Sequence, residues 1–345
     1  MPSLRHSSDR EPGYTRRRRG RGWRFLDERG RAITDPKRLA RLRSLPIPPA
    51  WRDVWICRSA RGHLQATGVD EAGRKQYLYH PRWREERDRE KYERILVFAE
   101  RLPDLRATVA RHLRRRRVTR ETALAAAVQL LDRSNIRVGS EEYTRRYGTF
   151  GLATLRSRHV EVDGDRVLLD FKGKGGARQQ VEIEDARLAR VVAAMDALPG
   201  REVFSYLDED GEVADVRSED VNAYIKEHAG EEFSAKDFRT WSGTVAAAVA
   251  LAELGPVEGA RARQRAVTSV CRMAAELLGN TPAVCRASYI DPRVIDHFLD
   301  GRTIVSLVDE VERRMDEGHT AQELAVLALL RRGLEDRAAR AGTRG

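Results

Sequence analysis

The sequence lacks the usual signs of a metal site, a nucleotide site or a disulfide framework. It has three cysteines, none spaced as a CxxC pair, and its eight histidines are scattered. It contains no HExxH motif, no GxxxxGKS or GxxxxGKT motif, and no carboxylate cluster with metal-binding spacing. Taken together, these absences count against a metallonuclease and an ATPase. We therefore expect no metal ion and no small-molecule cofactor.

Long apolar runs are also missing. The chain has no stretch of about 18 or more apolar residues that would span a bilayer. Its first residues carry the positive charges of a signal peptide without the apolar region that follows them in such peptides. We expect no membrane segment and a cytoplasmic location.

Positive charge is what the chain has in excess. It has 64 lysines and arginines against 53 aspartates and glutamates, a formal net charge of +11. This surplus predicts a polyanionic partner, with nucleic acid as the first candidate and an anionic membrane surface as the second. At 345 residues, 41% of them hydrophobic, the chain is long enough for two domains.

We expect three regions along the chain. Residues 1–20 are polar, and the arginines of Arg16–Arg19 repel one another, which predicts a basic disordered arm. Such an arm can touch DNA phosphates or remain a solvated tail. Residues 21–90 hold short segments rich in aromatic and β-branched residues, and they predict a small β-rich domain. Residues 91–345 predict a larger, mainly helical domain, which makes the fold class α+β.

Three features of the larger region bear on its structure. A helical pattern runs over 85–116, and Pro103 is expected to interrupt it. Thr119 is suited to cap the next helix. Between 160 and 183 the alternation of apolar residues predicts strands, with a glycine-rich, basic hairpin tip at 173–176.

Four separated stretches carry side chains suited to attack on a phosphodiester. They are Ser134–Gly139, Phe171–Lys174, Lys236–Trp241 and Leu278–Tyr289. The planar guanidinium groups of Arg137 and Arg239 can neutralise charge on non-bridging oxygens. Lys174 can protonate a leaving oxygen, and Tyr289 can be the nucleophile once nearby positive charge favours its deprotonated form.

Each of these residues taken alone also fits an ordinary structural role. A tyrosine is often a core residue, an arginine a surface charge, and a lysine in a glycine-rich turn a solvated one. The local frame of Tyr289 is more informative, because Gly279 suits a helix C-terminus, Thr281 an N-cap and Pro282 the first helical position. Tyr289 is then expected about two turns into a short helix.

The ordered set of motifs resembles the type IB DNA topoisomerases, in the compact poxvirus-like form found in bacteria. The resemblance runs from about residue 20 to about residue 300. The motifs that carry it are Lys75–Tyr79, Arg137–Tyr143, Gly151–Leu155, Phe171–Lys174, Lys236–Thr240, Leu278–Pro282 and Tyr289. Each fragment is short, but chance would have to deliver all of them in the same order.

This resemblance implies a fold, an activity and a partner. The β-rich domain and the larger catalytic domain, with its hairpin or small sheet, would form a clamp around duplex DNA. The enzyme would nick one strand, let it rotate and reseal it, without ATP or metal. It would act as a monomer, in the bacterial cytoplasm at the nucleoid.

The resemblance also implies roles for nine residues. Tyr289 would form a 3′-phosphotyrosyl bond, Arg137 and Arg239 would hold the phosphate, and Lys174 would protonate the departing 5′-oxygen. The remaining contacts to DNA would come from Lys236, Gln76, Tyr77 and Tyr79. The family usually has a histidine where this chain has Asn280, whose amide can donate a hydrogen bond to a phosphate oxygen in its place.

Two other functions fit part of the sequence. A tyrosine recombinase shares this chemistry, but recombinases usually carry a His-x-x-Arg motif where this chain has Lys236–Arg239, and their N-terminal domain is usually helical. A non-catalytic DNA- or RNA-binding protein would need only the net charge and the arginine runs, and would not need Tyr289. A covalent-adduct assay separates an enzyme from a binding protein, and supercoil relaxation against strand exchange separates the two enzymes.

Overall fold

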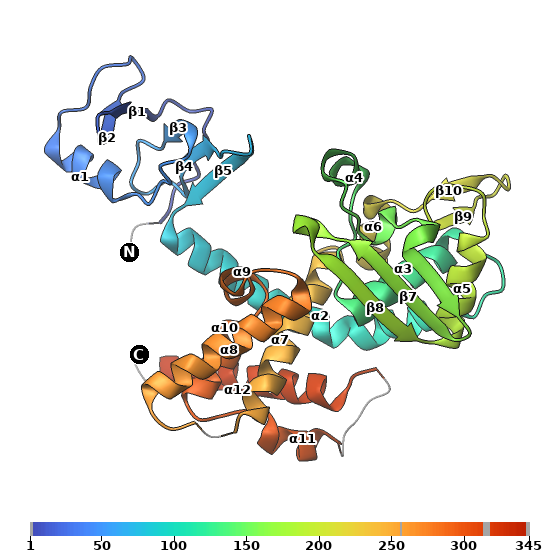
Figure 1. Ribbon diagram of the computed structural model, residues 1–345. Helices are drawn as coiled ribbons and strands as arrows, with labels where there is room; N and C mark the ends of the chain where they lie inside the picture. The colour runs from blue at the N-terminus through green and yellow to red at the C-terminus, as the bar shows by residue number, and fades with distance from the viewer. Residues whose placement is uncertain (1–2, 256, 313–317, 343–345) are drawn as a thin grey trace. The chain divides into compact units, whose positions relative to one another are not determined.

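The structure is a computed structural model that describes residues 3–255, 257–312 and 318–342 (Figure 1). The chain divides into two compact units, Met1–Tyr92 and Glu93–Gly345, which are called unit 1 and unit 2 below. Unit 1 is built mainly on a β-sheet, whereas unit 2 is mainly helical with small antiparallel sheets. The α+β class predicted from the sequence is therefore confirmed.

Unit 1 contains a five-stranded antiparallel sheet in the order β2-β1-β3-β4-β5. Its elements are β1 (Tyr14–Arg19), β2 (Gly22–Leu26), α1 (Pro36–Ser44), β3 (Arg52–Ile56), β4 (Leu64–Val69) and β5 (Lys75–Tyr79). Its core consists mainly of strand side chains such as Phe25, Ile56 and Ala66, joined by Leu42 from α1 and Ile47 from the loop after it. Alternation along the strands sends one set of side chains into this core, and β4 is buried on both of its faces.

The disordered arm expected over residues 1–20 is wrong. Arg5 forms a β-bridge with Gly62, Ser7 is buried, and residues 14–19 form strand β1. Tyr14 is buried in the core, and β1 pairs with both β2 and β3. The guanidinium of Arg16 lies 4.0 Å from the centroid of the Trp23 ring and donates to the Ile47 carbonyl at 3.1 Å. Pairing on both sides stabilises the strand, and its other arginines project toward solvent, so the run of positive charge does not unfold it.

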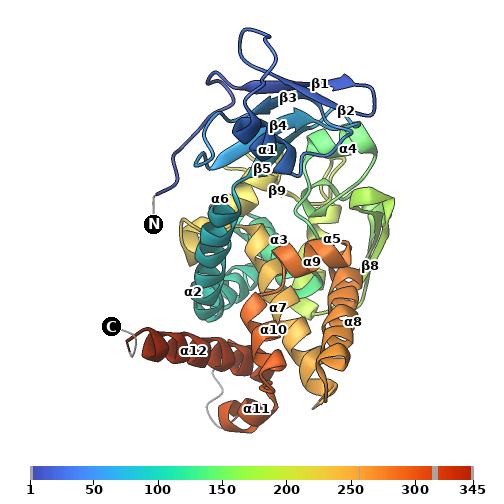
Figure 2. The ribbon, with the colours of Figure 1, turned by 90° about the vertical axis from the view of Figure 1, so that its left-hand side faces the viewer.

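Unit 2 is built around helix α7, which packs against α3, α6, α8, α10 and α12 (Figures 1 and 2). Its α-helices are α3 (Arg120–Ser134), α4 (Glu141–Tyr147), α5 (Ala186–Asp196), α6 (Ser218–Ala229), α7 (Ala235–Glu253), α8 (Ala260–Leu278), α9 (Pro282–Ser288), α10 (Pro292–Leu299), α11 (Val305–Glu312) and α12 (Ala321–Gly342). Three short 3-10 helices are η1 (Leu152–Thr154), η2 (Ser157–His159) and η3 (Lys174–Gly176). Helix α2 (Pro81–Leu113) begins in unit 1 and continues into unit 2.

The strands of unit 2 form two small antiparallel sheets. They are β6 (Val160–Asp163), β7 (Arg166–Lys172) and β8 (Arg178–Glu184) in one sheet, and β9 (Ser205–Leu207) and β10 (Val213–Asp215) in the other. Helices α3 and α5 pack against the first sheet (Figure 1). The hairpin predicted between 160 and 183 is therefore present, and η3 forms its tip.

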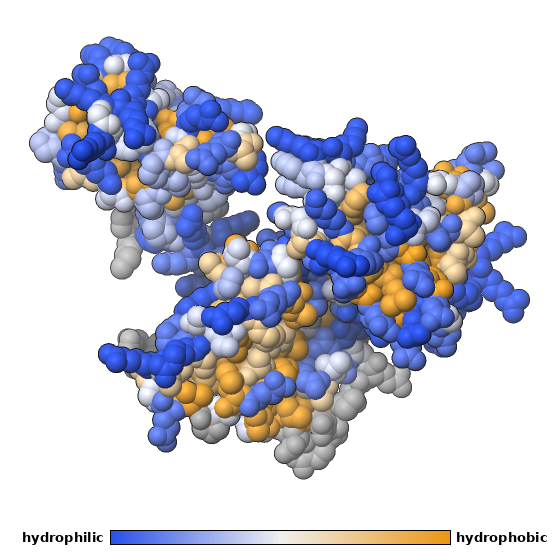
Figure 3. All heavy atoms as spheres, viewed as in Figure 1, coloured by the Kyte–Doolittle hydropathy of each residue, from blue (hydrophilic) through white to orange (hydrophobic). Residues whose placement is uncertain are grey.

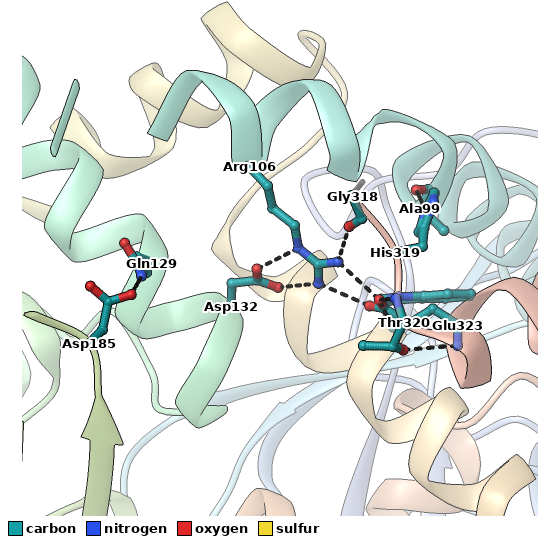
Figure 4. A network of polar contacts seen from close by, with 10 residues as sticks. Ala99, Arg106, Gln129, Asp132, Asp185, Gly318, His319, Thr320 and Glu323 are labelled. Atoms are coloured by element: carbon teal, nitrogen blue, oxygen red, sulfur yellow. Dashed lines mark hydrogen bonds and ion pairs between the residues drawn. The ribbon is translucent and has the colours of Figure 1, made fainter. Parts of the chain in front are cut away.

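Pro103 does not interrupt helix α2, which contradicts the sequence expectation. A proline inside a helix leaves the carbonyl four residues earlier without its N–H partner. Here that carbonyl, of Ala99, accepts a hydrogen bond from Nε2 of His319 at 2.7 Å (Figure 4). Gly318 packs so closely that an added Cβ would lie 2.3 Å from Pro103 Cβ. A segment more than 200 residues away thus compensates the helix locally.

Arg106 of α2 lies at the centre of a polar network that joins four helices (Figure 4). It donates to Asp132 of α3 at 2.7 and 3.0 Å, and to Glu323 of α12 at 2.9 Å through each terminal nitrogen. Nε1 of Trp241 in α7 donates to the same Glu323 carboxylate at 3.0 Å. Burial opposes the charge on Arg106, but the two carboxylates outweigh it and raise its pKa. The network holds α7 and the end of α3 together, and both carry residues of the site described next.

Hydrophilic side chains cover most of the face of the molecule drawn in Figure 3. The large apolar side chains most exposed among the described residues are Val305, at 58%, and Leu254, at 50%. Within the described ranges, no helix has both the length and the apolar character needed to cross a membrane.

Candidate active site

Arg137 lies between α3 and α4, and two glycines set its position. Its carbonyl accepts a hydrogen bond from the amide of Leu152 at 2.9 Å. A Cβ added to Gly139 would lie 2.7 Å from Gly151 Cα, and one added to Gly151 would lie 2.6 Å from Gly139 Cα. Only glycine permits this approach of two backbones, and Gly139 also has a φ of +79°. The tight backbone contact therefore determines where the Arg137 side chain projects.

Arg239 lies in α7 and is 4% exposed. Its Nη2 donates to the Leu278 carbonyl at 2.6 Å, and its Nη1 donates to the Asn135 carbonyl. Leu278 is the last residue of α8, and Asn135 caps α3 in the left-handed conformation, which asparagine tolerates well. The guanidinium carbon of Arg239 lies 5.3 Å from the centroid of the Tyr289 ring. One buried side chain thus ties three helices together beside the tyrosine.

Asn280 stands in the short link between α8 and α9. Gly279 ends α8 in the left-handed conformation, Thr281 accepts from the Val284 amide as the N-cap of α9, and Pro282 is the first residue of that helix. These three local predictions are confirmed. Nη2 of Arg137 donates to Asn280 Oδ1 at 2.7 Å.

The orientation of the Asn280 amide follows from this bond. A guanidinium can only donate, so Asn280 turns its oxygen to Arg137 and keeps its NH₂ group for another acceptor. That NH₂ group makes one long hydrogen bond, of 3.4 Å, to the Leu278 carbonyl. The group therefore keeps donor capacity for a ligand.

Tyr289 is the C-cap residue of α9, directly after the helix, and it is half-buried. Its amide donates to the Cys285 carbonyl at 2.9 Å. A Cβ added to Gly243 of α7 would lie 2.8 Å from the Tyr289 carbonyl oxygen, so only glycine lets α7 pass this close. The Asp291 amide donates a hydrogen bond to the Thr244 hydroxyl at 3.1 Å. These contacts hold the tyrosine backbone on α7, the helix that carries Arg239.

Arg137 and Arg239 are two neighbouring cations without a counter-charge. Among the described residues neither forms an ion pair, and the hydrogen bonds of their guanidiniums go to carbonyl and amide oxygens. Burial lowers the pKa of both groups, and for Arg239 the charge of Arg137 lowers it further. Buried positive charge that lacks a partner is costly, and an anion placed between the two would relieve that cost. The arrangement is that of an anion site next to a tyrosine.

The two lysines named from the sequence lie outside this cluster of contacts. Lys174 is exposed at the hairpin tip in η3, and Lys236 is exposed one turn before Arg239 in α7. Within the described part of the chain, neither side chain makes a hydrogen bond or an ion pair. The structure thus pairs Arg137 with Asn280 and Arg239 with Tyr289, and it leaves both lysines free to meet a ligand.

The three candidate DNA contacts of unit 1 share the edge strand β5. The rings of Tyr77 and Tyr79 are stacked, with centroids 6.2 Å apart, and Tyr77 is 46% exposed. Lys75 lies over the Tyr77 ring at 5.7 Å, and the Gln76 amide donates to Asp70 at 2.9 Å. Lys75 is also paired with Asp9 at 2.5 Å, so what this edge offers a ligand is chiefly the aromatic surface of the two tyrosines.

Sequence reasoning missed two residues that build the site. The Asn135 carbonyl accepts a hydrogen bond from Arg239, and Gly243 lets the Tyr289 backbone pack against α7 because it has no Cβ. A glycine inside a helix costs about 0.5–1 kcal/mol relative to alanine. Gly243 in the middle of an alanine-rich helix was therefore a signal of close packing that the sequence did contain.

Two protein-family models match the chain. The model for the catalytic core of eukaryotic DNA topoisomerase I matches residues 80–300, and the model for the N-terminal domain of bacterial DNA topoisomerase IB matches residues 22–70. The first range contains all the residues of the cluster and both lysines. The candidate contacts on β5 fall between the two matched ranges.

Curated proteins from viruses are similar over most of the chain. DNA topoisomerase 1B of Acanthamoeba polyphaga mimivirus is 30% identical over 261 residues, which cover 74% of this chain and 78% of that protein. DNA topoisomerase 1B of Vaccinia virus, strain Copenhagen, is 21% identical over 268 residues, covering 75% of this chain and 81% of that protein. In both cases the similarity covers about three quarters of this chain and of the viral protein.

Proposed function

The chain belongs to the type IB DNA topoisomerases, and on that premise we propose that Tyr289, Arg137, Arg239, Asn280 and Lys174 are its catalytic residues. A type IB topoisomerase cleaves one strand of duplex DNA, forms a 3′-phosphotyrosyl intermediate, allows rotation and reseals the strand. The observation that supports these residues best is the pair of partly buried guanidiniums without a counter-charge beside Tyr289. Membership of this family favours relaxation over the recombinase and over a non-catalytic binding role.

In the proposed reaction the scissile phosphate supplies the missing negative charge. Arg137 and Arg239 hold its non-bridging oxygens, and the free NH₂ of Asn280 donates to one of them. The Tyr289 hydroxyl releases its proton to solvent, favoured by the two guanidinium charges, and its oxygen forms a bond to phosphorus as the bond from phosphorus to the 5′-oxygen breaks. Lys174 donates its proton to the departing 5′-oxygen, and resealing reverses each step. The phosphotyrosyl bond conserves the energy of the broken bond, so the cycle needs no nucleotide.

The remaining assignments complete the proposal. Lys236 acts as an accessory cation near the phosphate, and Gln76, Tyr77 and Tyr79 contact DNA from the edge of β5. Residues 21–90 form the domain that closes over the duplex, and residues 91–345 form the catalytic domain. The protein acts on duplex DNA as a monomer, at the nucleoid in the cytoplasm.

The test of the proposed function is relaxation of negatively supercoiled plasmid in EDTA without ATP. We expect full relaxation, because the five proposed groups supply nucleophile, charge neutralisation and acid from the chain itself. Gel electrophoresis of the topoisomers measures it. A strict requirement for magnesium or ATP in every turnover would contradict the proposal.

Substitution of Asn280 tests its donor role. Asn280→Ala removes the NH₂ group, and loss of one such donor typically slows catalysis about 10²- to 10³-fold. Asn280→His is expected to stay active, because a histidine nitrogen can donate at the position where the family usually has histidine. Single-turnover cleavage of a duplex measures both variants. An alanine variant as fast as the wild type would remove Asn280 from the mechanism.

A further inference from the structure

Gln179 connects the hairpin tip to the loop that carries Asn280. It is the second residue of β8 and is half-buried. A Cβ built on Gly173 would lie 2.8 Å from Gln179 Cγ, so the stem of the side chain lies against the Gly173 backbone. A Cβ built on Gly279 would lie 3.3 Å from Gln179 Nε2, so the amide tip reaches the Gly279 backbone. Gly173 directly precedes Lys174, and Gly279 directly precedes Asn280.

The amide tip of Gln179 lies close to the anion site. A Cβ built on Gly279 would lie 3.3 Å from Gln179 Nε2 and 3.9 Å from Arg137 Nη1. The two side chains therefore approach the same point beside Gly279. The only hydrogen bond of the Gln179 side chain among the described residues is long, 3.4 Å from Nε2 to the Arg178 carbonyl. Packing between two glycines, rather than hydrogen bonding, therefore sets the position of this side chain.

Apart from Gln179, the hairpin tip is held by its own turn and by the Phe150 amide, which donates to the Lys172 carbonyl at 2.8 Å. The Gly173 amide donates to the Ala177 carbonyl at 2.8 Å, and the Gly176 amide donates to the Gly173 carbonyl at 3.0 Å. These bonds close the turn without attaching it to Arg137 or Asn280. Gly175 and Gly176 both have positive φ, and Lys174 is exposed. The bond from Phe150 fixes the base of the tip, and Gln179 is the side chain that reaches from the tip to the Gly279 backbone beside Asn280.

We propose that Gln179 is a positioning residue that holds the Lys174 hairpin against the Gly279–Asn280 loop. The inference rests on the proposed role of Lys174 as the acid. Gln179 keeps the proton donor and the groups that bind the phosphate in one geometry. A displacement of about 1 Å in such a geometry can cost about a hundredfold in rate. Loss of this contact therefore impairs proton delivery, while the phosphate groups and the tyrosine remain in place.

The test uses Gln179→Ala and the matched control Gln180→Ala in the full chain. Gln180 is the next residue on the same strand, is exposed, and donates to Asp170 within the hairpin at 3.3 Å. Single-turnover cleavage is measured on duplex DNA with the normal 5′-oxygen leaving group and on DNA with a 5′-thiolate leaving group. We expect Gln179→Ala to be about tenfold to a hundredfold slower on normal DNA and equal to wild type on thiolate DNA. Gln180→Ala should match wild type on both.

Rescue by the thiolate separates a positioning role from a general loss of structure, because an unfolded variant would cleave neither substrate. The inference is overturned if the Gln179→Ala variant cleaves normal DNA as fast as the wild type. It is also overturned if Gln179→Ala stays slow on thiolate DNA while Lys174→Ala, measured in parallel, is rescued by the thiolate. If Lys174→Ala itself is not rescued, the role of Lys174 as the acid fails, and the inference falls with it.

Discussion

Replacing Tyr289 with phenylalanine is expected to abolish covalent attachment of this protein to DNA. The change removes one hydroxyl group, whose oxygen forms the bond to phosphorus in the proposed reaction. Denaturing the wild type in mid-reaction should trap DNA on the protein, and peptide mapping should place the adduct on Tyr289. The variant should give no adduct and no relaxation above background.

The same variant is expected to fold and bind DNA normally. Tyr289 is half-buried, and the contacts that hold it are made by its backbone with Cys285 and Gly243, which the substitution leaves intact. The Arg239 guanidinium can lie beside a phenylalanine ring as it does beside the tyrosine. Thermal unfolding and a DNA-binding titration are the controls. If Tyr289→Phe still forms an adduct, the nucleophile is elsewhere and the five assignments fail together.

Lys174→Ala is expected to lose cleavage of normal DNA while keeping its structure. Lys174 is exposed at the hairpin tip and has no partner in the described part of the chain, so its removal should not affect stability. Removal of a general acid typically costs about 10²- to 10⁴-fold in rate. Cleavage should return on DNA whose 5′ leaving group is a thiolate, because a good leaving group needs no proton.

Two other lysines provide the comparison for this prediction. Lys172 is exposed in β7 of the same hairpin, and Lys236 is exposed in α7 before Arg239. Their alanine variants should show no selective rescue by the thiolate. If thiolate DNA rescues one of them and not Lys174→Ala, the acid is that lysine.

The parts of this protein that could be predicted from sequence depend on local interactions. Gly279, Thr281 and Pro282 define the end of one helix and the start of the next within four residues, and the structure confirms them. The hairpin tip after Phe171 follows from its glycines in the same way. The ordered motifs extended this local information to the family, because chance would have to deliver all of them in the same order.

Where the sequence expectation was wrong, a distant segment changed the outcome. The arginine run was predicted to be disordered, but pairing with β2 and β3 makes it a strand. Pro103 was predicted to interrupt a helix, but His319 supplies the hydrogen bond that the proline cannot. Local rules describe the cost of a charge run or a proline, and they do not include a partner that lies far along the chain.

By itself the sequence determined the class of the fold, the chemistry of the side chains and the family. Only the tertiary structure decided which of those side chains meet. Arg137 and Asn280 are 143 residues apart in the chain and 2.7 Å apart in space, and Arg239 lies under the Tyr289 ring. Arg239 is buried and Arg137 half-buried without a counter-charge, and Gln179 packs between two glycines. Both arrangements depend on packing among several helices and a hairpin. Such packing follows from the whole core at once, and no short stretch of sequence encodes it.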